Sequence, residues 1–220
     1  MKKLIYVLLL TVLFSCGNDK VVLLPEINHS EITEILDVSP GYLFYDETKT
    51  EGVELNRKNL ISTTNWLINI DKRLTLKQVI PHIKYLQDKK ANSSHKKEGV
   101  KNYYTCNDTS KKNLGFIDFT DVVYFTDSKG YKHDVKTDHA NIIFLNQNDI
   151  RIITSDTKVI ETEKTTLTGT IKELFELKEA LLYLEFNDNL SFQEYITFKA
   201  LMSKLDLENI KISNHEIIFN

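Results

Sequence analysis

The sequence predicts an α+β protein made of two tandem small domains, each with the element order β-β-α-β-α-β. Three observations lead to this fold class. The segment "LINIDKRLTLKQVI" at residues 67–80 has a counterpart in "YLEFNDNLSFQEYI" at residues 183–196, and both read as a strand, a polar break and an amphipathic helix. The elements around the two segments follow the same order. Hydrophobic residues make up 41% of the chain, which is enough to build packed cores.

The N-terminus carries the features of a signal peptide. Basic "MKK" precedes the apolar run "LIYVLLLTVLF", which is too short to span a bilayer as a helix of roughly 20 residues. The run ends in "LFSC", which resembles a bacterial lipobox with Cys16 as the lipidated residue. We therefore expect residues 1–15 to be removed and residues 16–30 to form a lipidated N-terminus and a short tether. A buried N-terminal helix is the alternative.

The first domain is predicted over residues 31–127. Alternating apolar and polar residues in "EITEILDV" predict a strand over 31–38, "SPG" predicts a turn at 39–41, and "YLFYDE" predicts a second strand. Apolar residues at roughly helical intervals predict a short helix within residues 52–67.

The second part of this domain contains the repeated segment. "NWLINI" predicts a strand that Asp71 ends, and Thr75 is the expected N-cap of the helix that follows. Pro81 lies inside the apolar stripe of this helix, where it can kink the helix or shift its start. The lysine-rich residues 89–113 indicate a solvated loop, and residues 114–125 indicate a strand or a hairpin.

Residues 128–140 are the predicted linker to a second domain at 141–220. Two strands about the polar "NQND" turn come first, followed by the helix "TLTGTIKELFEL" and the strand "ALLYLEF". Ser191 is the expected N-cap of the next helix, and Glu194 three residues later completes a capping box. One or two strands in "LENIKISNHEIIFN" close the domain.

The duplication is based on pattern and not on residue identity. Setting Leu74 against Leu190 aligns the two segments at an offset of 116 residues and pairs Thr75 with Ser191. Identical residues are about as frequent as chance would give, so the matched strand, cap and helix carry the comparison. A single α/β domain, whose strand–helix units look alike, is the alternative.

A strand ending in Asp, then a polar pair, an apolar residue and an amphipathic helix, resembles the periplasmic domain of the ExbD/TolR family. "WLINIDKRLTLKQVIPHIKYLQ" follows this pattern, and "LLYLEFNDNLSFQEYITFKALMSKLD" follows it with Asn187 in place of the Asp. The resemblance covers most of residues 31–126 and 141–219, and it implies domains that dimerise and contact partners or the cell wall. Family members also carry a transmembrane helix with an acidic residue in a proton pathway. "LIYVLLLTVLFSC" contains no acidic residue, so the resemblance does not extend to that step.

Two groups of residues are candidates for a chemical site. Asp71 follows a strand and is a candidate binding residue, although ending the strand and starting the helix already explains its presence. "HDVKTDH" brings together His133, Asp134, Asp138 and His139, whose donor atoms suit zinc or copper. A solvated interdomain loop is the alternative for this segment.

Other chemistry is not indicated. Cys106 in "NYYTCND" has no neighbouring base and is expected to be inert. The motifs of serine hydrolases, zinc proteases and phosphate-binding loops do not occur, so no cofactor is expected. A net charge of −3 lacks the basic footprint of nucleic-acid binding.

These features predict a non-enzymatic bacterial lipoprotein of the cell envelope, extracytoplasmic and attached through Cys16, with the outer membrane favoured over the inner. It is expected to be a binding or scaffold component, either of a biopolymer-transport assembly or on peptidoglycan. An envelope hydrolase with a site around Asp71 and a glycan-binding surface lipoprotein are the alternatives. The sequence leaves the oligomeric state and the identity of the partner open.

Overall fold

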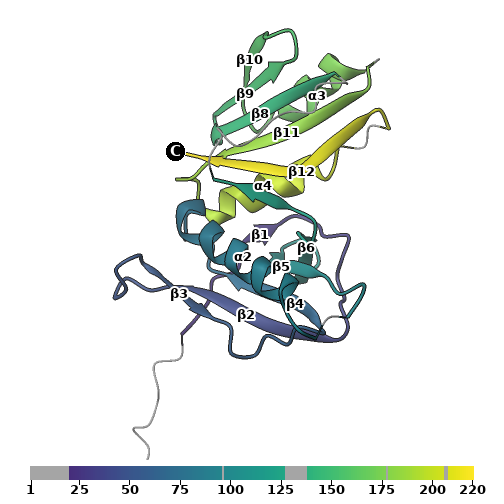
Figure 1. Cartoon of the computed structure of the whole chain (residues 1–220). Helices are drawn as coiled ribbons and strands as arrows, with labels where there is room; N and C mark the ends of the chain where they lie inside the picture. Colours follow the sequence, from purple (N-terminus) through teal and green to yellow (C-terminus); the bar gives the residue numbers. More distant parts are fainter. Residues whose placement is uncertain (1–19, 96, 127–137, 177, 206–207) are drawn as a thin grey trace, which may run out of the picture.

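The computed structural model describes residues 20–95, 97–126, 138–176, 178–205 and 208–220. These residues form two six-stranded sheets and three helices, so the predicted mixed α+β class is confirmed. One sheet lies in the lower part of the molecule and the other in the upper part, and helices α2 and α4 meet where the two parts join (Figure 1). We call the lower sheet with α2 the first half, and the upper sheet with α3 and α4 the second half.

In the first half, an antiparallel hairpin, β2–β3, lies at one edge of the sheet. β4 runs parallel to β2, and β5 runs parallel to β4; helix α2 connects β4 to β5. β5 also pairs with the short parallel β1 and with the antiparallel β6. The elements are β1 (Glu26–Ile27), β2 (Val38–Tyr45), β3 (Val53–Asn56), β4 (Asn65–Ile70), α2 (Leu76–Ala91), β5 (Asn102–Asp108) and β6 (Asn113–Asp118).

The second half is built in the same way. The antiparallel hairpin β8–β9 is followed by β11 parallel to β8 and by β12 parallel to β11, with α4 connecting the last two strands. β10 extends the sheet beyond β9, and β7 pairs with the outer edge of β12. The elements are β7 (Val123–Phe125), β8 (His139–Asn146), β9 (Asp149–Thr154), β10 (Val159–Thr162), α3 (Leu167–Phe175), β11 (Ala180–Asn187), α4 (Phe192–Met202) and β12 (Ile210–Phe219).

The two sheets therefore share a four-strand order, β3-β2-β4-β5 in one and β9-β8-β11-β12 in the other. The strand directions match as well. Ile68 on β4 is opposite Tyr104 on β5, and Leu184, which lies 116 residues after Ile68, is opposite Glu216 on β12. The offset of 116 residues thus relates β4 to β11, whereas the paired positions on β5 and β12 are 112 residues apart.

Three predictions for the start of the first half were wrong. Residues 31–37 form no strand beyond an isolated bridge at Ile32, and Leu36 is exposed. The predicted turn at 39–41 lies inside β2, where Pro40 pairs on the β4 side only. The short helix predicted within 52–67 is replaced by β3 and turns, so this half lacks the first helix of the predicted element order.

The loop predicted over residues 89–113 contains a central strand. Within it, β5 is buried along most of its length, including Tyr104 and Cys106 at 0% exposure. The lysines that suggested a loop flank this strand in sequence and do not belong to it. A short buried strand bounded by charged turns was therefore mistaken for surface.

The division between the sheets differs from the predicted domain limits. β1 lies inside the predicted tether at 16–30, and β7 lies inside the predicted first domain at 31–127 although it belongs to the second sheet. Most of the predicted linker at 128–140 is outside the described residues, and its last part, from His139, already belongs to β8.

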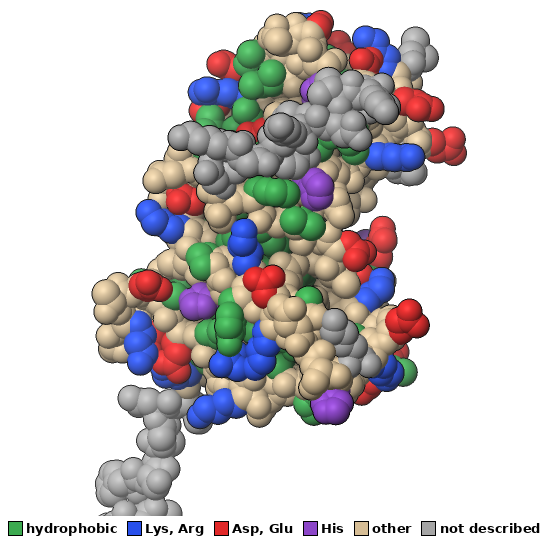
Figure 2. Space-filling model, viewed as in Figure 1, with side chains coloured by type: hydrophobic (Ala, Val, Ile, Leu, Met, Phe, Trp, Pro, Cys, Tyr) green, Lys and Arg blue, Asp and Glu red, His purple; other side chains and the backbone are tan. Residues whose placement is uncertain are grey.

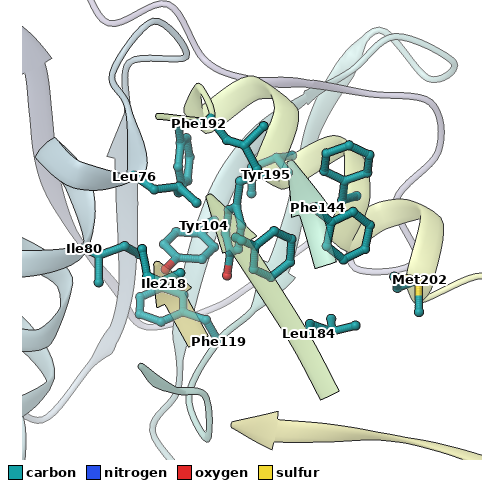
Figure 3. Packing of buried hydrophobic residues seen from close by; sticks show 14 of the residues in the cluster. Leu76, Ile80, Tyr104, Phe119, Phe144, Leu184, Phe192, Tyr195, Met202 and Ile218 are labelled. Carbon is teal, nitrogen blue, oxygen red and sulfur yellow. The ribbon is translucent and has the colours of Figure 1, made fainter. Parts of the chain in front are cut away.

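The buried hydrophobic residues of the two halves form one continuous core. At the junction, Tyr104 of β5 stacks on Phe119 with ring centroids 3.9 Å apart and meets Phe192 and Tyr195 of α4 edge to face (Figure 3). Leu76 of α2 lies in the same cluster. The halves are thus joined by packed side chains as well as by the chain.

Candidate functional site

Asp71 is fixed where β4 ends. Its carboxylate is fully buried and accepts two side-chain hydrogen bonds from Arg73, each 2.8 Å, together with the backbone amides of Arg73 and Leu23. The Arg73 guanidinium lies over the Tyr45 ring, 4.4 Å from its centroid. Burial by itself would raise the pKa of the Asp71 carboxyl, but the hydrogen bonds from Arg73 outweigh it and hold that pKa below its usual value. The carboxylate is therefore a structural anchor with its oxygens occupied.

The strand ends of the two halves meet each other through matched hydrogen bonds. The Leu76 amide at the start of α2 donates to the Leu190 carbonyl at 2.9 Å. The equivalent amide of Phe192 at the start of α4 donates to the Leu74 carbonyl at 2.6 Å. The next amides along each helix repeat the pattern: Lys77 to Asp188 at 2.8 Å, and Gln193 to Lys72 at 3.2 Å. Each half thus supplies carbonyls to the helix N-terminus of the other.

The two N-caps complete this arrangement. Thr75 and Ser191 face each other in an isolated antiparallel bridge, and each forms a capping box, with Gln78 and Glu194 respectively. The N-cap positions predicted at Thr75 and Ser191 are confirmed, as is the capping box at Ser191. A helix start leaves its first amides without intrahelical acceptors, and here the cap and the opposite half satisfy them. This meeting place is filled by backbone.

The other sequence candidates are Cys106 and the four residues of "HDVKTDH". Cys106 is buried on β5, and burial raises the pKa of its thiol to about 12. His133 and Asp134 lie outside the described residues. Asp138 is exposed, and the His139 ring lies edge-on to Tyr183 with centroids 6.2 Å apart. Within the described ranges, no group of three or more His, Cys, Asp or Glu side chains is placed to hold a metal ion.

A groove runs between the two halves and was not anticipated from the sequence. It has a volume of about 390 Å³, and it is formed by the segment after β1, by β6, by the C-terminal end of α4 and by β12. We call it the interhalf groove; the outline of the molecule is notched between the halves in Figure 2. Its apolar walls are formed mainly by Ile27, Ile32, Phe116, Val122, Met202 and Ile212.

A buried polar chain ends at this groove. Lys199 of α4 lines the groove and forms an ion pair with Glu216 of β12, whose side chain is fully buried. The Tyr195 hydroxyl donates to the other Glu216 oxygen at 2.8 Å. Behind it, the Tyr124 hydroxyl is 3.1 Å from that of Tyr195 and 2.7 Å from that of Tyr104. Each tyrosine hydroxyl has one proton, and that of Tyr195 is donated to Glu216. Tyr124 must therefore donate to Tyr195, and Tyr104 to Tyr124, so all three hydroxyl protons point toward Glu216.

The first half has no such ion pair at the equivalent place. At the offset of 116 residues Lys199 corresponds to Ile83, and by strand register Glu216 corresponds to Tyr104. Ile83 is fully buried in the apolar stripe of α2. The alignment of the two segments could have revealed this site, because it places a lysine where the helix stripe of the first half is isoleucine.

A second, wider cleft of about 840 Å³ lies beside the C-terminal end of α2. Burial lowers the pKa of Lys90 in its wall to about 8. The Lys90 ammonium donates to the Asn102 side chain at 2.8 Å and to the Lys101 carbonyl at 3.1 Å, and it lies 4.8 Å from the Trp66 ring centroid. These partners satisfy the ammonium within the protein.

Comparisons with protein-family models, with curated proteins and with solved structures gave no match for this chain. The helices of the described residues are all too short or too polar to cross a membrane. The functional argument therefore depends on the residues and their geometry.

Proposed function

We propose that this protein is a lipid-anchored, non-enzymatic binding component of the bacterial cell envelope, with the interhalf groove as its binding site. Under this proposal Cys16 carries the lipid, and the outer membrane is the favoured location. The two halves are then copies of one small unit of the ExbD/TolR type, in line with the strand, polar break and capped helix that occur in each. A biopolymer-transport assembly or peptidoglycan is the proposed setting.

The observation that carries the proposal is that the chain is held to the first half only a few residues after Cys16. Lys20 forms ion pairs with Asp46, at 2.8 Å, and with Glu54 at the β2–β3 hairpin. Cys16 precedes Lys20 by four residues, which span at most about 14 Å when extended. A lipid on Cys16 would therefore hold the first half at the membrane surface.

Binding is favoured over catalysis by the state of the reactive side chains. Asp71, the centre of the hydrolase alternative, has its oxygens occupied by Arg73 and by backbone amides. The Cys106 thiol is buried and protonated at neutral pH. The interhalf groove offers apolar walls with a few polar groups, which is the usual composition of a ligand site.

Two experiments test the proposal. Cells producing the wild-type protein, Cys16→Ala and the control Cys106→Ala are fractionated, and the protein is followed by immunoblot. We expect Cys16→Ala to leave the membrane fraction, while Cys106→Ala stays in it. A Cys16→Ala protein that remained fully membrane-bound would refute the anchor.

Affinity purification of the lipidated protein in a gentle detergent, followed by mass spectrometry, addresses the partner. Stoichiometric recovery of an envelope transport protein supports the ExbD/TolR-like role. Recovery of the protein alone contradicts a role in a transport assembly. A peptidoglycan pull-down then tests whether the protein binds peptidoglycan instead.

A further inference from the structure

We infer that the interhalf groove binds a single-chain amphiphile, a long apolar chain ending in a carboxylate, with the carboxylate on Lys199. This inference rests on the proposed function in that it takes the groove to be the binding site, and it goes further by naming the class of ligand. Four features of the groove lead to it: the walls, the Lys199 ammonium, a second lysine and the comparison with the first half.

The walls suit an apolar chain of small cross-section. Aliphatic and aromatic side chains from both halves line the groove, and its volume of about 390 Å³ lies within the range of about 300–1,000 Å³ that is usual for small-ligand sites. Leu184 of β11, at 0% exposure, also lines the groove, together with residues of α4 and β12. Each methylene group buried there would raise the affinity about fourfold.

The ammonium of Lys199 supplies the polar end of the site. Its side chain is only 15% exposed, and among the described residues its hydrogen-bond partner is Glu216. An ammonium has three N–H donors, so two remain for a group in the groove. Both oxygens of Glu216 are already engaged, by Lys199 and by Tyr195. A ligand carboxylate in the groove can therefore accept hydrogen bonds that water accepts when the groove is empty.

A second lysine lies on the same wall. Lys204 follows α4, lines the groove, and donates to the Asn28 carbonyl at 2.9 Å. No acidic side chain lies within ion-pair distance of it among the residues that the structure describes. The acids Glu31 and Asp118 belong to the opposite wall, where Asp118 is paired with Lys101. Among the described residues, the two lysines of the groove therefore lie on the α4 side and the two acids on the opposite side.

The comparison between the halves separates function from stability. A buried ion pair contributes little net stability compared with apolar residues of similar size. The first half packs Ile83 and Tyr104 at the equivalent positions and buries both completely. The second half therefore does not need Lys199 and Glu216 to fold. Their presence at the groove is explained by recognition of a charged group.

The probe for the test is oleate, with oleyl alcohol as the uncharged chain of the same length. The mature chain, residues 16–220 with Cys16→Ala, is purified without detergent, and binding is measured by calorimetry below the concentration at which oleate forms micelles. We expect one oleate per chain, bound about ten- to a hundred-fold more tightly than oleyl alcohol, because the lost contact is a charge-assisted hydrogen bond.

Variants assign the binding to the groove. Lys199→Met combined with Glu216→Gln removes both charges together and keeps an acceptor for Tyr195; it should weaken oleate by the same factor and leave oleyl alcohol unchanged. Ala200→Phe, which fills the groove, should abolish binding of both. Lys97→Met, which removes an exposed lysine elsewhere, should bind oleate as the wild type does.

Several results would overturn the inference. These are no saturable oleate binding by the folded wild type, equal affinity for oleate and oleyl alcohol, or an unchanged oleate affinity in the Lys199→Met/Glu216→Gln protein. Displacement of oleate by an extended apolar peptide that binds more tightly would also overturn it, in favour of a protein segment as the occupant. Failure of oleate binding would leave the Cys16 fractionation result as it stands, so the two proposals fail separately.

Discussion

Lys199 and Glu216 carry opposite charges at a place where water is largely excluded. Removing one member of a buried pair leaves the other charge without compensation, and this is usually more harmful than removing both. The Tyr195 hydroxyl can solvate part of the Glu216 charge but cannot neutralise it. The pair is therefore a sensitive point of the second half, whatever the groove binds.

We predict that Lys199→Met alone lowers the free energy of unfolding by about 3–5 kcal/mol. Lys199→Met combined with Glu216→Gln should lower it by clearly less, because no unpaired charge remains. Urea denaturation followed by far-UV circular dichroism measures both values. If the double variant were as unstable as the single one, the loss would come from packing and not from the unpaired carboxylate.

The Asp71 carboxylate should make stability depend on pH in a defined direction. The pKa of Asp71 is lower in the folded protein than in the unfolded chain, so the ionised carboxylate stabilises the folded state. This stabilisation is fully present above about pH 4 and is lost as the pH falls through the folded-state pKa. We predict that Asp71→Asn costs about 2 kcal/mol at pH 7 and less at pH 3. Urea titrations at the two pH values measure this.

A surface pair provides the control for that measurement. Asp37 and Lys97 are more than half exposed, and Asp37→Asn should change the free energy of unfolding by less than about 1 kcal/mol at neutral pH. An Asp71→Asn protein that behaved like Asp37→Asn would show that the Arg73 contact contributes little to folding.

Cys106 should be unreactive in the folded protein. Its thiol is at 0% exposure and its pKa is about 12, so the thiolate is scarce at pH 8. In the Cys16→Ala protein we predict reaction with a disulfide reagent only after urea unfolds the chain. Rapid reaction of one equivalent of protein thiol with the reagent, before urea is added, would contradict the buried position of Cys106 on β5.

At the scale of elements, the two capped helix starts should be energetically coupled. Thr75→Ala and Ser191→Ala each remove a capping box, at a cost of about 1 kcal/mol. Because the caps face each other and the helix amides bond to the opposite half, the double variant should deviate from additivity by at least about 0.5 kcal/mol. A double-mutant cycle in urea tests this, and strict additivity would indicate that the two starts fold independently.

The elements that the sequence predicted well are those with strong local signals. Thr75 and Ser191 each precede an apolar stripe of helical period, and α2 and α4 begin directly after them. The errors occur where tertiary pairing decides. β3 is a strand because it pairs with β2, although the spacing of Val53, Leu55 and Leu60 also suits a helix.

The site was harder to predict than the fold, for a physical reason. Lys199 and Glu216 are distant in sequence, and a charged residue on a helix or strand normally indicates solvent. Their burial depends on the packing of α4 against β12 and on β7, which crosses from the first half to pair with β12. No short pattern contains that information. Asp71 was identified from its position after a strand, and its structural role then followed from Arg73.

At the scale of the whole molecule, the continuous core should make the two halves unfold together. Trp66 is the only tryptophan, lies in β4 and reports on the first half alone, whereas circular dichroism reports on both. We predict that urea transitions measured by Trp66 fluorescence and by circular dichroism coincide. Separate midpoints would mean that the junction around Tyr104 and Tyr195 is weaker than the cores on either side.

Two identical subunits related by an axis must carry the same side chain on both sides of it. Here both halves belong to one polypeptide, so one can keep Ile83 and Tyr104 while the other holds Lys199 and Glu216. For the proposed site at Lys199, the expected stoichiometry is therefore one ligand per chain and not two. If Cys16 carries the proposed lipid, the first half, which binds Lys20 through Asp46, would lie next to the membrane. The proposed ligand site in the second half could then change without altering the attachment.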